Sequence, residues 1–156
     1  EGFAHPRTGV HTYANRGLAG IDGNISTALG VAYGHKATIA VLGDLSFLHD
    51  LTGLINKEEI NCRFIVINND GGGIFSTLPQ RGVNGFETVF GTPHGLNPAA
   101  IAQAMGVQAK QITSLKELEA EVKAPISGIS VVVCDVPDRE SNADTLKKVV
   151  VDISSI

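Results

Sequence analysis

The sequence predicts a three-layer α/β domain, in which helices cover both faces of a mainly parallel sheet. Three continuous apolar runs, each with the length of a buried strand, support this prediction; they span residues 37–42, 63–68 and 129–135. Helical patterns alternate with these runs, which is typical of strand–helix–strand units. We expect a single domain with about six strands, an ordinary number for one sheet.

The first half of the chain predicts a helix, a strand, a helix and a strand. The helix at 24–34 contains small residues that would let it pack closely on the sheet (Ala28, Gly30, Ala32 and Gly34). The strand at 37–42 follows. A second helix is expected at 47–56, where leucines recur at helical spacing (Leu48, Leu51 and Leu54). The strand at 63–68 ends this half, and we expect both strands to be buried.

The second half has clear helix starts. Asn97 is a predicted N-cap and Pro98 the first residue of a helix at 98–105. A short strand candidate at 107–111 comes next. Ser114 and Glu117 form the pattern of a capping box, which predicts a helix at 114–122. The strand at 129–135 and a helix at 144–151 complete the domain.

The stretch 70–98 differs from the rest of the chain, because it holds seven glycines and is too long for an ordinary strand-to-helix loop. We expect it to be functional, and to be mobile in much of 71–93 when no ligand is bound.

The composition excludes several classes of protein. The chain has 156 residues, of which 43% are apolar and 18% charged, so it is globular rather than disordered. Its net charge of −4 is unlike that of a nucleic-acid-binding protein. No apolar run approaches the ~20 residues of a membrane span. We expect Cys62 and Cys134 to be buried core thiols of a cytoplasmic protein, since both lie in or beside apolar runs.

Polar residues follow two of the predicted strands. Asp44 comes directly after the first strand and Asn69 directly after the second, 25 positions later. In a parallel sheet, ligands bind beyond the carboxyl ends of the strands, so these two side chains are expected at the same edge. A carboxylate, an amide oxygen and a loop carbonyl are oxygen ligands that suit Mg²⁺. Taken singly, each motif is more often a plain structural turn; the pair at this spacing is more specific.

The surrounding residues suit an anion. Gly43 would let a backbone amide approach a phosphate closely, and the helix after Leu45 would direct its N-terminus at that phosphate. The run 71–73 is able to form a second nest of amides or to expose a carbonyl to the metal.

Three segments in order carry a resemblance to a known family. They are residues 15–23 (NRGLAGIDG), 43–51 (GDLSFLHDL) and 68–79 (NNDGGGIFSTLP). The chain resembles, over residues 13–106, the 2-succinyl-5-enolpyruvyl-6-hydroxy-3-cyclohexene-1-carboxylate synthases of menaquinone biosynthesis, which are thiamin-diphosphate enzymes. The usual Gly-Asp-Gly of such enzymes is Gly-Asp-Leu here, and Leu45 narrows the choice within the superfamily.

This resemblance implies a thiamin-diphosphate-binding fold and assigns roles to individual residues. Mg²⁺, or Mn²⁺ in its place, would be bound by the side chains of Asp44 and Asn69 and by the carbonyl of Gly71. The cofactor would be lined by a larger set, namely Gly20, Ile21, Gly43, Leu45, Ser46, Gly72 and Ile74. Ile21 would hold the cofactor bent; the alternative is a plain core residue.

The resemblance also implies the substrates. Members of the family add the decarboxylated 2-oxoglutarate unit to isochorismate. Arg16 would meet substrate carboxylates, which agrees with the bidentate contacts that arginine makes; the alternative is a surface pair with Asp22. Three apolar residues would form a wall beside the isochorismate ring, or else pack beneath the loop: Ile74, Phe75 and Leu78. His49 and His94 are interpreted as structural.

The domain organisation implied is a single C-terminal diphosphate-binding domain, residues 1–156, of a larger homodimeric or homotetrameric enzyme. The pyrimidine-binding and middle domains of such enzymes have no counterpart in these residues, so we expect little or no synthase activity from the chain alone.

Three alternatives remain open. Another thiamin-diphosphate carboligase or decarboxylase, of the acetolactate-synthase type, is disfavoured by Leu45 and by the segment 15–17. A non-catalytic module that binds Mg²⁺ and a diphosphate is the second. A flavodoxin-like mononucleotide binder is the third, but it would need a Ser/Thr-rich loop after the first strand, and none is present.

Overall fold

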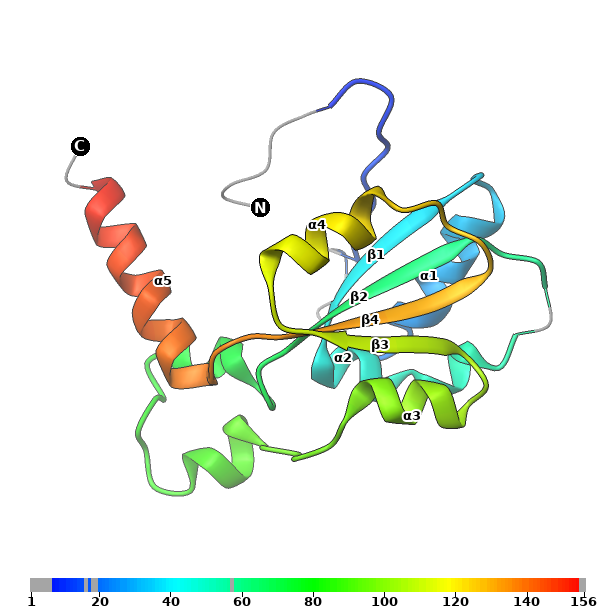
Figure 1. The fold of residues 1–156 in the computed structure, drawn as a ribbon. Helices are drawn as coiled ribbons and strands as arrows, with labels where there is room; N and C mark the ends of the chain where they lie inside the picture. The colour runs from blue at the N-terminus through cyan, green and yellow to red at the C-terminus, as the bar shows by residue number, and fades with distance from the viewer. Residues whose placement is uncertain (1–6, 16, 18–19, 57, 155–156) are drawn as a thin grey trace.

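The structure is a computed structural model that describes residues 7–15, 17, 20–56 and 58–154. These residues form one four-stranded, fully parallel sheet in the order β1-β2-β4-β3 (Figure 1). The strands are β1 (Thr38–Gly43), β2 (Cys62–Asn68), β3 (Gln108–Ile112) and β4 (Ile129–Asp135). The expectation of about six strands is therefore wrong for the described residues, in which only the four candidate segments named from the sequence form strands.

Helices cover both faces of the sheet, as predicted. On one face, α1 (Asn24–Tyr33), α2 (Asp44–His49) and α3 (Pro98–Ala104) contribute side chains to the larger core. On the other face, Leu118 of α4 (Leu115–Lys123) packs against a smaller core that includes Ile65 and Val132. The three-layer arrangement is therefore confirmed.

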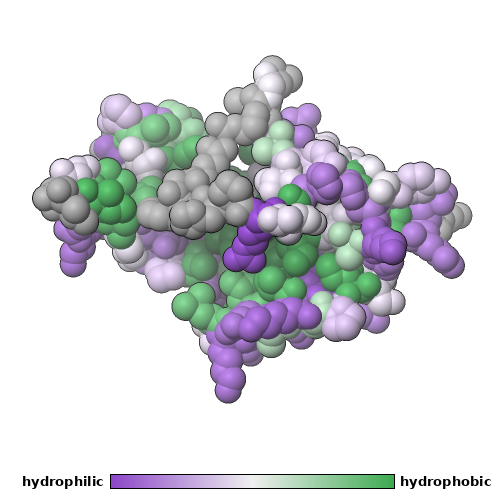
Figure 2. All heavy atoms as spheres, turned by 90° about the horizontal axis from the view of Figure 1, so that it is seen from above, coloured by the Kyte–Doolittle hydropathy of each residue, from purple (hydrophilic) through white to green (hydrophobic). Residues whose placement is uncertain are grey.

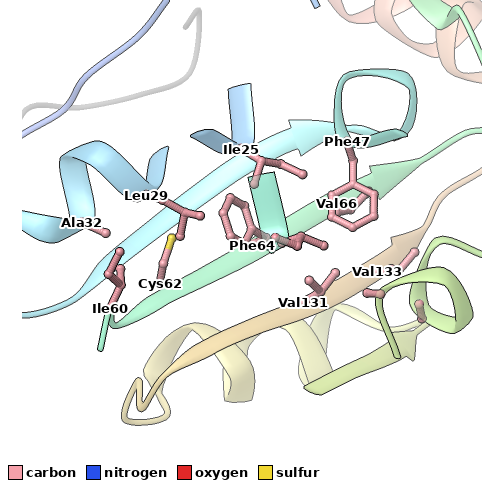
Figure 3. Packing of buried hydrophobic residues seen from close by; sticks show 13 residues of the cluster. Ile25, Leu29, Ala32, Phe47, Ile60, Cys62, Phe64, Val66, Val131 and Val133 are labelled. Atoms are coloured by element: carbon pink, nitrogen blue, oxygen red, sulfur yellow. The ribbon is translucent and has the colours of Figure 1, made fainter. Parts of the chain in front are cut away.

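The larger core lies between α1, α2 and the sheet (Figure 3). Ile25 and Leu29 of α1 and Phe47 of α2 point toward the sheet, where Phe64 and Val66 of β2 lie. All five side chains are buried. Burial of this apolar surface stabilises the packing of α1 and α2 on the central strands by roughly 25 cal/mol for each Å² removed from water.

Strand β1 is less buried than its apolar sequence predicts. Its exposure alternates along the strand, and Val41 keeps 65% of its surface accessible. β1 lies at an edge of the sheet, and the α4-side core does not reach it. Only β2 and β4 are covered on both faces, so the expectation that 37–42 is a buried strand is wrong, whereas that for 63–68 is confirmed.

The predicted helix starts are confirmed at two positions. The Asn97 side chain accepts a hydrogen bond from the Ala100 amide at 3.0 Å. The Ser114 hydroxyl accepts one from the Glu117 amide at 3.3 Å, as a capping box requires. The strand candidate at 107–111 is confirmed as β3, one residue later.

Two helices differ from expectation. The predicted helix 47–56 is split, because α2 ends at His49 and a 3₁₀ turn follows at Leu51–Leu54. Between them, the Asp50 carboxylate turns toward α1 and accepts the Ser26 amide at 2.7 Å. The last helix, α5 (Arg139–Ser154), begins five residues earlier than predicted, because Asp138 accepts a hydrogen bond from the Ser141 amide at 2.9 Å and caps it.

The glycine-rich stretch lies at the carboxyl edge of the sheet and beside the start of α5 (Figure 1). It forms a 3₁₀ turn at Gly73–Thr77 and a π-helical turn at Glu87–Gly91. Its mobility without ligand stays a prediction. None of the helices in the described part of the chain combines the length and the apolar character that a membrane crossing needs.

Candidate functional site

Asp44 is the buried centre of the candidate site. It is the first residue of α2, directly after β1, and only 2% of its surface is accessible. Its Oδ1 accepts the Leu45 amide at 2.7 Å, and its Oδ2 accepts the Gly71 amide at 2.8 Å. A carboxylate buried to this degree needs such donors. Asp44 therefore joins the start of α2 to the glycine run after β2, and two predicted metal-binding residues lie together.

His94 completes the surroundings of Asp44. Its Nε2 lies 3.2 Å from Oδ2 of Asp44, and the Leu96 amide donates to its Nδ1 at 3.0 Å. Because Nδ1 accepts a hydrogen bond, the proton of the neutral ring belongs on Nε2, which then donates to Asp44. The structural interpretation of His94 agrees with these contacts. His94 and Asp44 are 50 positions apart in the sequence, and no sequence pattern predicted that they would meet.

Asp70 ties the two ends of the glycine-rich stretch together. Its backbone is left-handed, with φ of 60°, and its Oδ1 accepts the amides of Gly95 at 2.7 Å and His94 at 3.1 Å. The hydrogen bond from the Gly95 amide, followed by the one from His94, lowers the pKa of the Asp70 carboxyl in spite of partial desolvation. The charged form of Asp70 thus holds the segment that carries His94.

Gly71 and Gly72 are closely approached by another part of the backbone. Gly71 has a φ of 129°, and a Cβ there would overlap the carbonyl oxygen of Gly91. A Cβ at Gly72 would overlap the carbonyl oxygen of Phe90, and the Gly72 amide donates to Gly91 at 2.8 Å. Side chains are excluded from both positions, so backbone groups rather than side chains form this part of the site.

Gly43 has open space beside it. Its backbone is extended, and a Cβ added there would meet no atom within 4 Å. Leu45 and Ser46, both half-buried, form the first turn of α2 after it. The residues expected to line a diphosphate thus lie at the start of a helix next to open space, from which an anion is able to approach the backbone.

Asn69, the third predicted ligand, directly follows β2 and is half-buried. Its amide lies against Gly73, where a Cβ would overlap Nδ2 of Asn69. Among the described residues, no group of three or more His, Cys, Asp and Glu side chains is arranged to hold a metal ion. One carboxylate with an amide and a carbonyl oxygen is a different ligand set, which Mg²⁺ completes with phosphate and water.

The expected aminopyrimidine contacts lie on the loop before α1. Ile21 is 40% accessible, so the structure does not place it in a core. Gly20 belongs to a hollow of about 260 Å³ that is lined by Asn15, Gly17, Gly20, Asp22, Gly23 and Thr27. Arg16, the predicted substrate residue, lies outside the described residues.

The predicted apolar wall is divided between surface and core. Ile74 is 69% accessible and Leu78 is also exposed. Phe75 is half-buried, and its ring lies 5.5 Å from that of Phe90. Ile74 and Leu78 are therefore free to meet a ligand, whereas Phe75 also packs within the loop.

Arg139 was not anticipated from the sequence. It begins α5, and its guanidinium donates to the Asp70 carbonyl and pairs with Glu87. The available signal was its position shortly after the carboxyl end of β4, at the same edge of the sheet as Asp44 and Asn69.

A larger hollow, of about 590 Å³, lies at the opposite end of the sheet. Asn61, Val107 and Gly128, which precede β2, β3 and β4, are among its lining residues. Ligands of parallel α/β sheets bind beyond the carboxyl ends of the strands, so we assign the site to the Asp44 end despite the smaller hollow there.

Comparison with known proteins gives a consistent result. A family profile described as "Thiamine pyrophosphate enzyme, C-terminal TPP binding domain" matches residues 2–136. Several curated relatives are 2-succinyl-5-enolpyruvyl-6-hydroxy-3-cyclohexene-1-carboxylate synthases. That of Thermobifida fusca is 47% identical over 69% of this chain and 21% of its own. The relative from Nocardia farcinica is 45% identical over 82% of this chain and 25% of its own length. The relative from Synechocystis is 39% identical over 93% of this chain and 25% of its own length.

Solved structures agree on the fold. The thiamine diphosphate-dependent 4-hydroxybenzoylformate decarboxylase of Rhodococcus jostii RHA1 has a TM-score of 0.62 and 17% identity, and the match covers 75% of this chain and 23% of that one. A putative thiamin diphosphate-dependent enzyme from Mycobacterium smegmatis has a TM-score of 0.55 and 24% identity, and the match covers 73% of this chain and 22% of that one. The chain spans about a quarter of the length of the curated relatives that it matches.

Proposed function

Because the chain belongs to the thiamine pyrophosphate enzymes, through their C-terminal TPP binding domain, we propose that it supplies the metal and diphosphate half-site of a synthase of menaquinone biosynthesis. The parent enzyme adds the decarboxylated 2-oxoglutarate unit to isochorismate. The observation that carries the proposal is the hydrogen bond between Asp44 Oδ2 and the Gly71 amide, which brings two of the three expected metal-binding residues together at the strand ends. The names of the relatives support the choice of synthase.

The residues present fit a divalent cation with a diphosphate. Asp44, Asn69 and the Gly71 carbonyl offer oxygen atoms only, which is the preference of Mg²⁺ and also serves Mn²⁺. The open space at Gly43, at the start of α2, is where backbone amides are able to meet phosphate oxygens. Glycine at 71 and 72 lets the backbone at 90–91 lie directly against this run, which positions the backbone groups of the proposed site.

Each part of the chain has a defined task in this proposal. Thiamin diphosphate, when bound, supplies the electron sink that lets a 2-oxo acid lose carbon dioxide. The protein binds the metal and diphosphate through Asp44 and its neighbours, and Ile21 gives bulk beside the cofactor rings. The buried Asp44 carboxylate has three polar neighbours among the described residues, the amides of Leu45 and Gly71 and Nε2 of His94, which fix its oxygens where the cation is proposed to bind. His94 and Leu45 keep that carboxylate oriented.

The substrate side is built from apolar surface and one cation. Ile74 and Leu78 are exposed apolar side chains close to the glycine run, and we propose that they face the isochorismate ring, with Phe75 behind them. Arg16 is proposed to bind the carboxylates of the substrates, both of which are polyanions. Assay of the full-length parent with isochorismate and 2-oxoglutarate, against pyruvate alone, separates this synthase from an acetolactate-synthase-type enzyme.

Exposed apolar surface supports a half-site that works with further protein. β1 exposes Ile39 and Val41, and α5 exposes four apolar side chains: Leu146, Val150, Val151 and Ile153. Apolar surface of this kind is visible in the middle of the face seen from above (Figure 2). Uncovered apolar patches mark interaction surfaces in soluble proteins. We propose a cytoplasmic homodimer or homotetramer, in which a pyrimidine-binding domain completes the site.

Calorimetric titration of thiamin diphosphate, with and without Mg²⁺, tests the proposal. We expect binding that requires Mg²⁺ and that Asp44→Ala abolishes. Asp50→Ala is the matched control, because Asp50 is also a buried carboxylate that accepts a backbone amide, yet its partner is Ser26 of α1 and not a residue of the candidate site. Mg²⁺-dependent binding that survives Asp44→Ala would show that the ligand assignment is wrong. Absence of binding even in the full-length parent would overturn the cofactor assignment itself.

A further inference from the structure

We propose that Arg139, the first residue of α5, is a positioning residue for the cation site, because it fixes the peptide group between Asp70 and Gly71. The inference rests on the proposed function, since the Gly71 carbonyl is the expected metal ligand next to that peptide. Arg139 itself touches neither cofactor nor substrate in this proposal. It acts through the backbone of the glycine run.

The contacts of Arg139 all lead to the glycine-rich stretch. Its Nη1 donates to the carbonyl oxygen of Asp70, and its Nη2 pairs with the Glu87 carboxylate. A Cβ added to Gly71 would lie 2.8 Å from Nη1, so the guanidinium is packed directly against Gly71. Only 11% of the Arg139 side chain is accessible, and its buried Nε has no hydrogen-bond partner in the described structure.

The place of Arg139 in the helix does not explain its burial. A cation in the first turn of a helix is opposed by the helix dipole, which favours acidic residues there. Removing a guanidinium from water costs further free energy unless its donors are paired. The groups that pair with it belong to the stretch 70–91 rather than to α5. The interaction therefore serves the loop, not the stability of the helix alone.

The peptide group between Asp70 and Gly71 is held on both sides. Arg139 binds its carbonyl oxygen, and the Asp44 carboxylate binds its N–H at 2.8 Å. A planar peptide with both polar ends bound has a fixed orientation. This peptide places the Cα of Gly71, and the next peptide, which carries the Gly71 carbonyl, is held by the Gly72 amide donating to Gly91 at 2.8 Å and by the Gly73 amide donating to the Gly71 carbonyl at 2.9 Å. Loss of Arg139 would free one side of the Asp70–Gly71 peptide and loosen the position of Gly71, with its carbonyl, against Asp44.

Arg81 provides a matched control, because it also joins the glycine-rich stretch to α5. Its Nε donates to Glu140 at 2.6 Å, and its Nη1 donates to Asp144 at 2.7 Å. These contacts lie on the first two turns of α5, and within the described structure none of them reaches Asp70 or Gly71. Arg81→Met thus weakens the same attachment without releasing the peptide.

The test compares the 156-residue chain with its Arg139→Met and Arg81→Met variants. Amide hydrogen exchange, followed by NMR without ligand, reports how firmly the Gly71 and Gly72 amides are held. A titration with Mg²⁺ and thiamin diphosphate, followed by the same resonances, gives the affinity. Urea unfolding measures the global stability of each variant. We expect Arg139→Met to remove the protection of both amides and to weaken Mg²⁺ binding by about 10-fold, the usual effect of losing a residue that orients a ligand. Arg139→Lys retains the charge, and its amide protection and Mg²⁺ affinity are expected to lie between those of the original chain and those of Arg139→Met.

The outcomes separate this inference from the proposed function. Equal effects of Arg139→Met and Arg81→Met on exchange and affinity, or no change in either, would overturn the positioning role. If neither the unchanged chain nor Asp44→Ala responds to Mg²⁺ and the cofactor, the proposed function fails for this chain. The exchange of Gly71 then still decides whether Arg139 holds the peptide.

Discussion

The Gly71 amide donates a 2.8 Å hydrogen bond to Oδ2 of Asp44, across the carboxyl ends of β1 and β2. Two residues 27 positions apart therefore share one buried contact. The same bond connects the first residue of α2 to the run of glycines. The positions of the two halves of the proposed cation site therefore depend on each other. A change on either side is expected to disturb both.

Gly71→Ala should disrupt the site and lower stability. The φ of 129° and the overlap of a Cβ with the Gly91 carbonyl both oppose alanine, and such strain costs about 1–3 kcal/mol. We expect a lower urea midpoint and loss of Mg²⁺-dependent binding in calorimetry. Gly30→Ala is the control, because Gly30 lies within α1 with open space around it and alanine should stabilise the helix by about 0.5–1 kcal/mol. Equal behaviour of the two variants would refute the close approach at Gly71.

Asp50→Ala should destabilise the packing of α1 on the rest of the domain. Asp50 accepts the Ser26 amide at 2.7 Å and the Ser26 hydroxyl at 3.1 Å, and both donors would lose their partner. Leaving such groups unpaired in this partly buried place, beside the buried Asp50 side chain, costs about 1–3 kcal/mol, which urea unfolding measures directly.

Asp138→Ala is the matched control for Asp50, since Asp138 accepts the amide and hydroxyl of Ser141 in the same way but on an exposed helix start. We expect a smaller loss there, because water replaces the missing acceptor. A loss at Asp50 no larger than that at Asp138 would contradict the buried role of Asp50.

Local patterns predicted much of the fold. The caps at Asn97 and Ser114 involve residues three positions apart, so the sequence alone contains both partners. The polar residues after β1 and β2 were found for a related reason, because parallel strands place their ends at one edge whatever their order. The partial exposure of β1 was not predictable, since an apolar run does not reveal that Ile39 and Val41 lie on an edge strand.

Long-range contacts account for what the sequence did not predict. His94 reaches Asp44 over 50 positions, and Arg139 reaches Asp70 over 69, with no periodicity to connect them. The split after α2 has the same origin, because Asp50 is drawn to Ser26 by a contact 24 positions away. The strand ends pointed to Asp44, Asn69 and Gly43, the resemblance assigned the individual metal and diphosphate roles, and these roles stay predictions until binding is measured.

Asp70→Asn should change how stability depends on pH. The amides of Gly95 and His94 lower the pKa of the Asp70 carboxyl from its ordinary value of 3.8. A lowered folded-state pKa means that the charged form stabilises the fold above 3.8, and that this contribution is lost as the pH falls through the folded-state value. Asparagine tolerates the left-handed backbone at this position and keeps the acceptor oxygen, so only the charge is removed.

Urea unfolding of the original chain and of Asp70→Asn over a range of pH measures this effect. We expect a constant difference in midpoint above about pH 5, which shrinks as the pH falls below the ordinary value. A difference that stays constant down to the lowest pH would show that the charge of Asp70 does not stabilise the segment 94–95.

The thiols of Cys62 and Cys134 should be unreactive while the domain is folded. Burial raises the pKa of Cys62 to about 12, and burial, with a smaller effect from Asp135, raises that of Cys134. The thiolate is the reactive form of cysteine. Both thiols should therefore resist Ellman's reagent at about pH 8, close to the pKa of a free thiol, and should react once urea unfolds the chain. Lys116→Cys, on the exposed surface of α4, is the control and should react at once. Cys62 lies beneath α1 (Figure 3), so a fast reaction at Cys62 in the folded chain would mean that α1 detaches readily from the sheet.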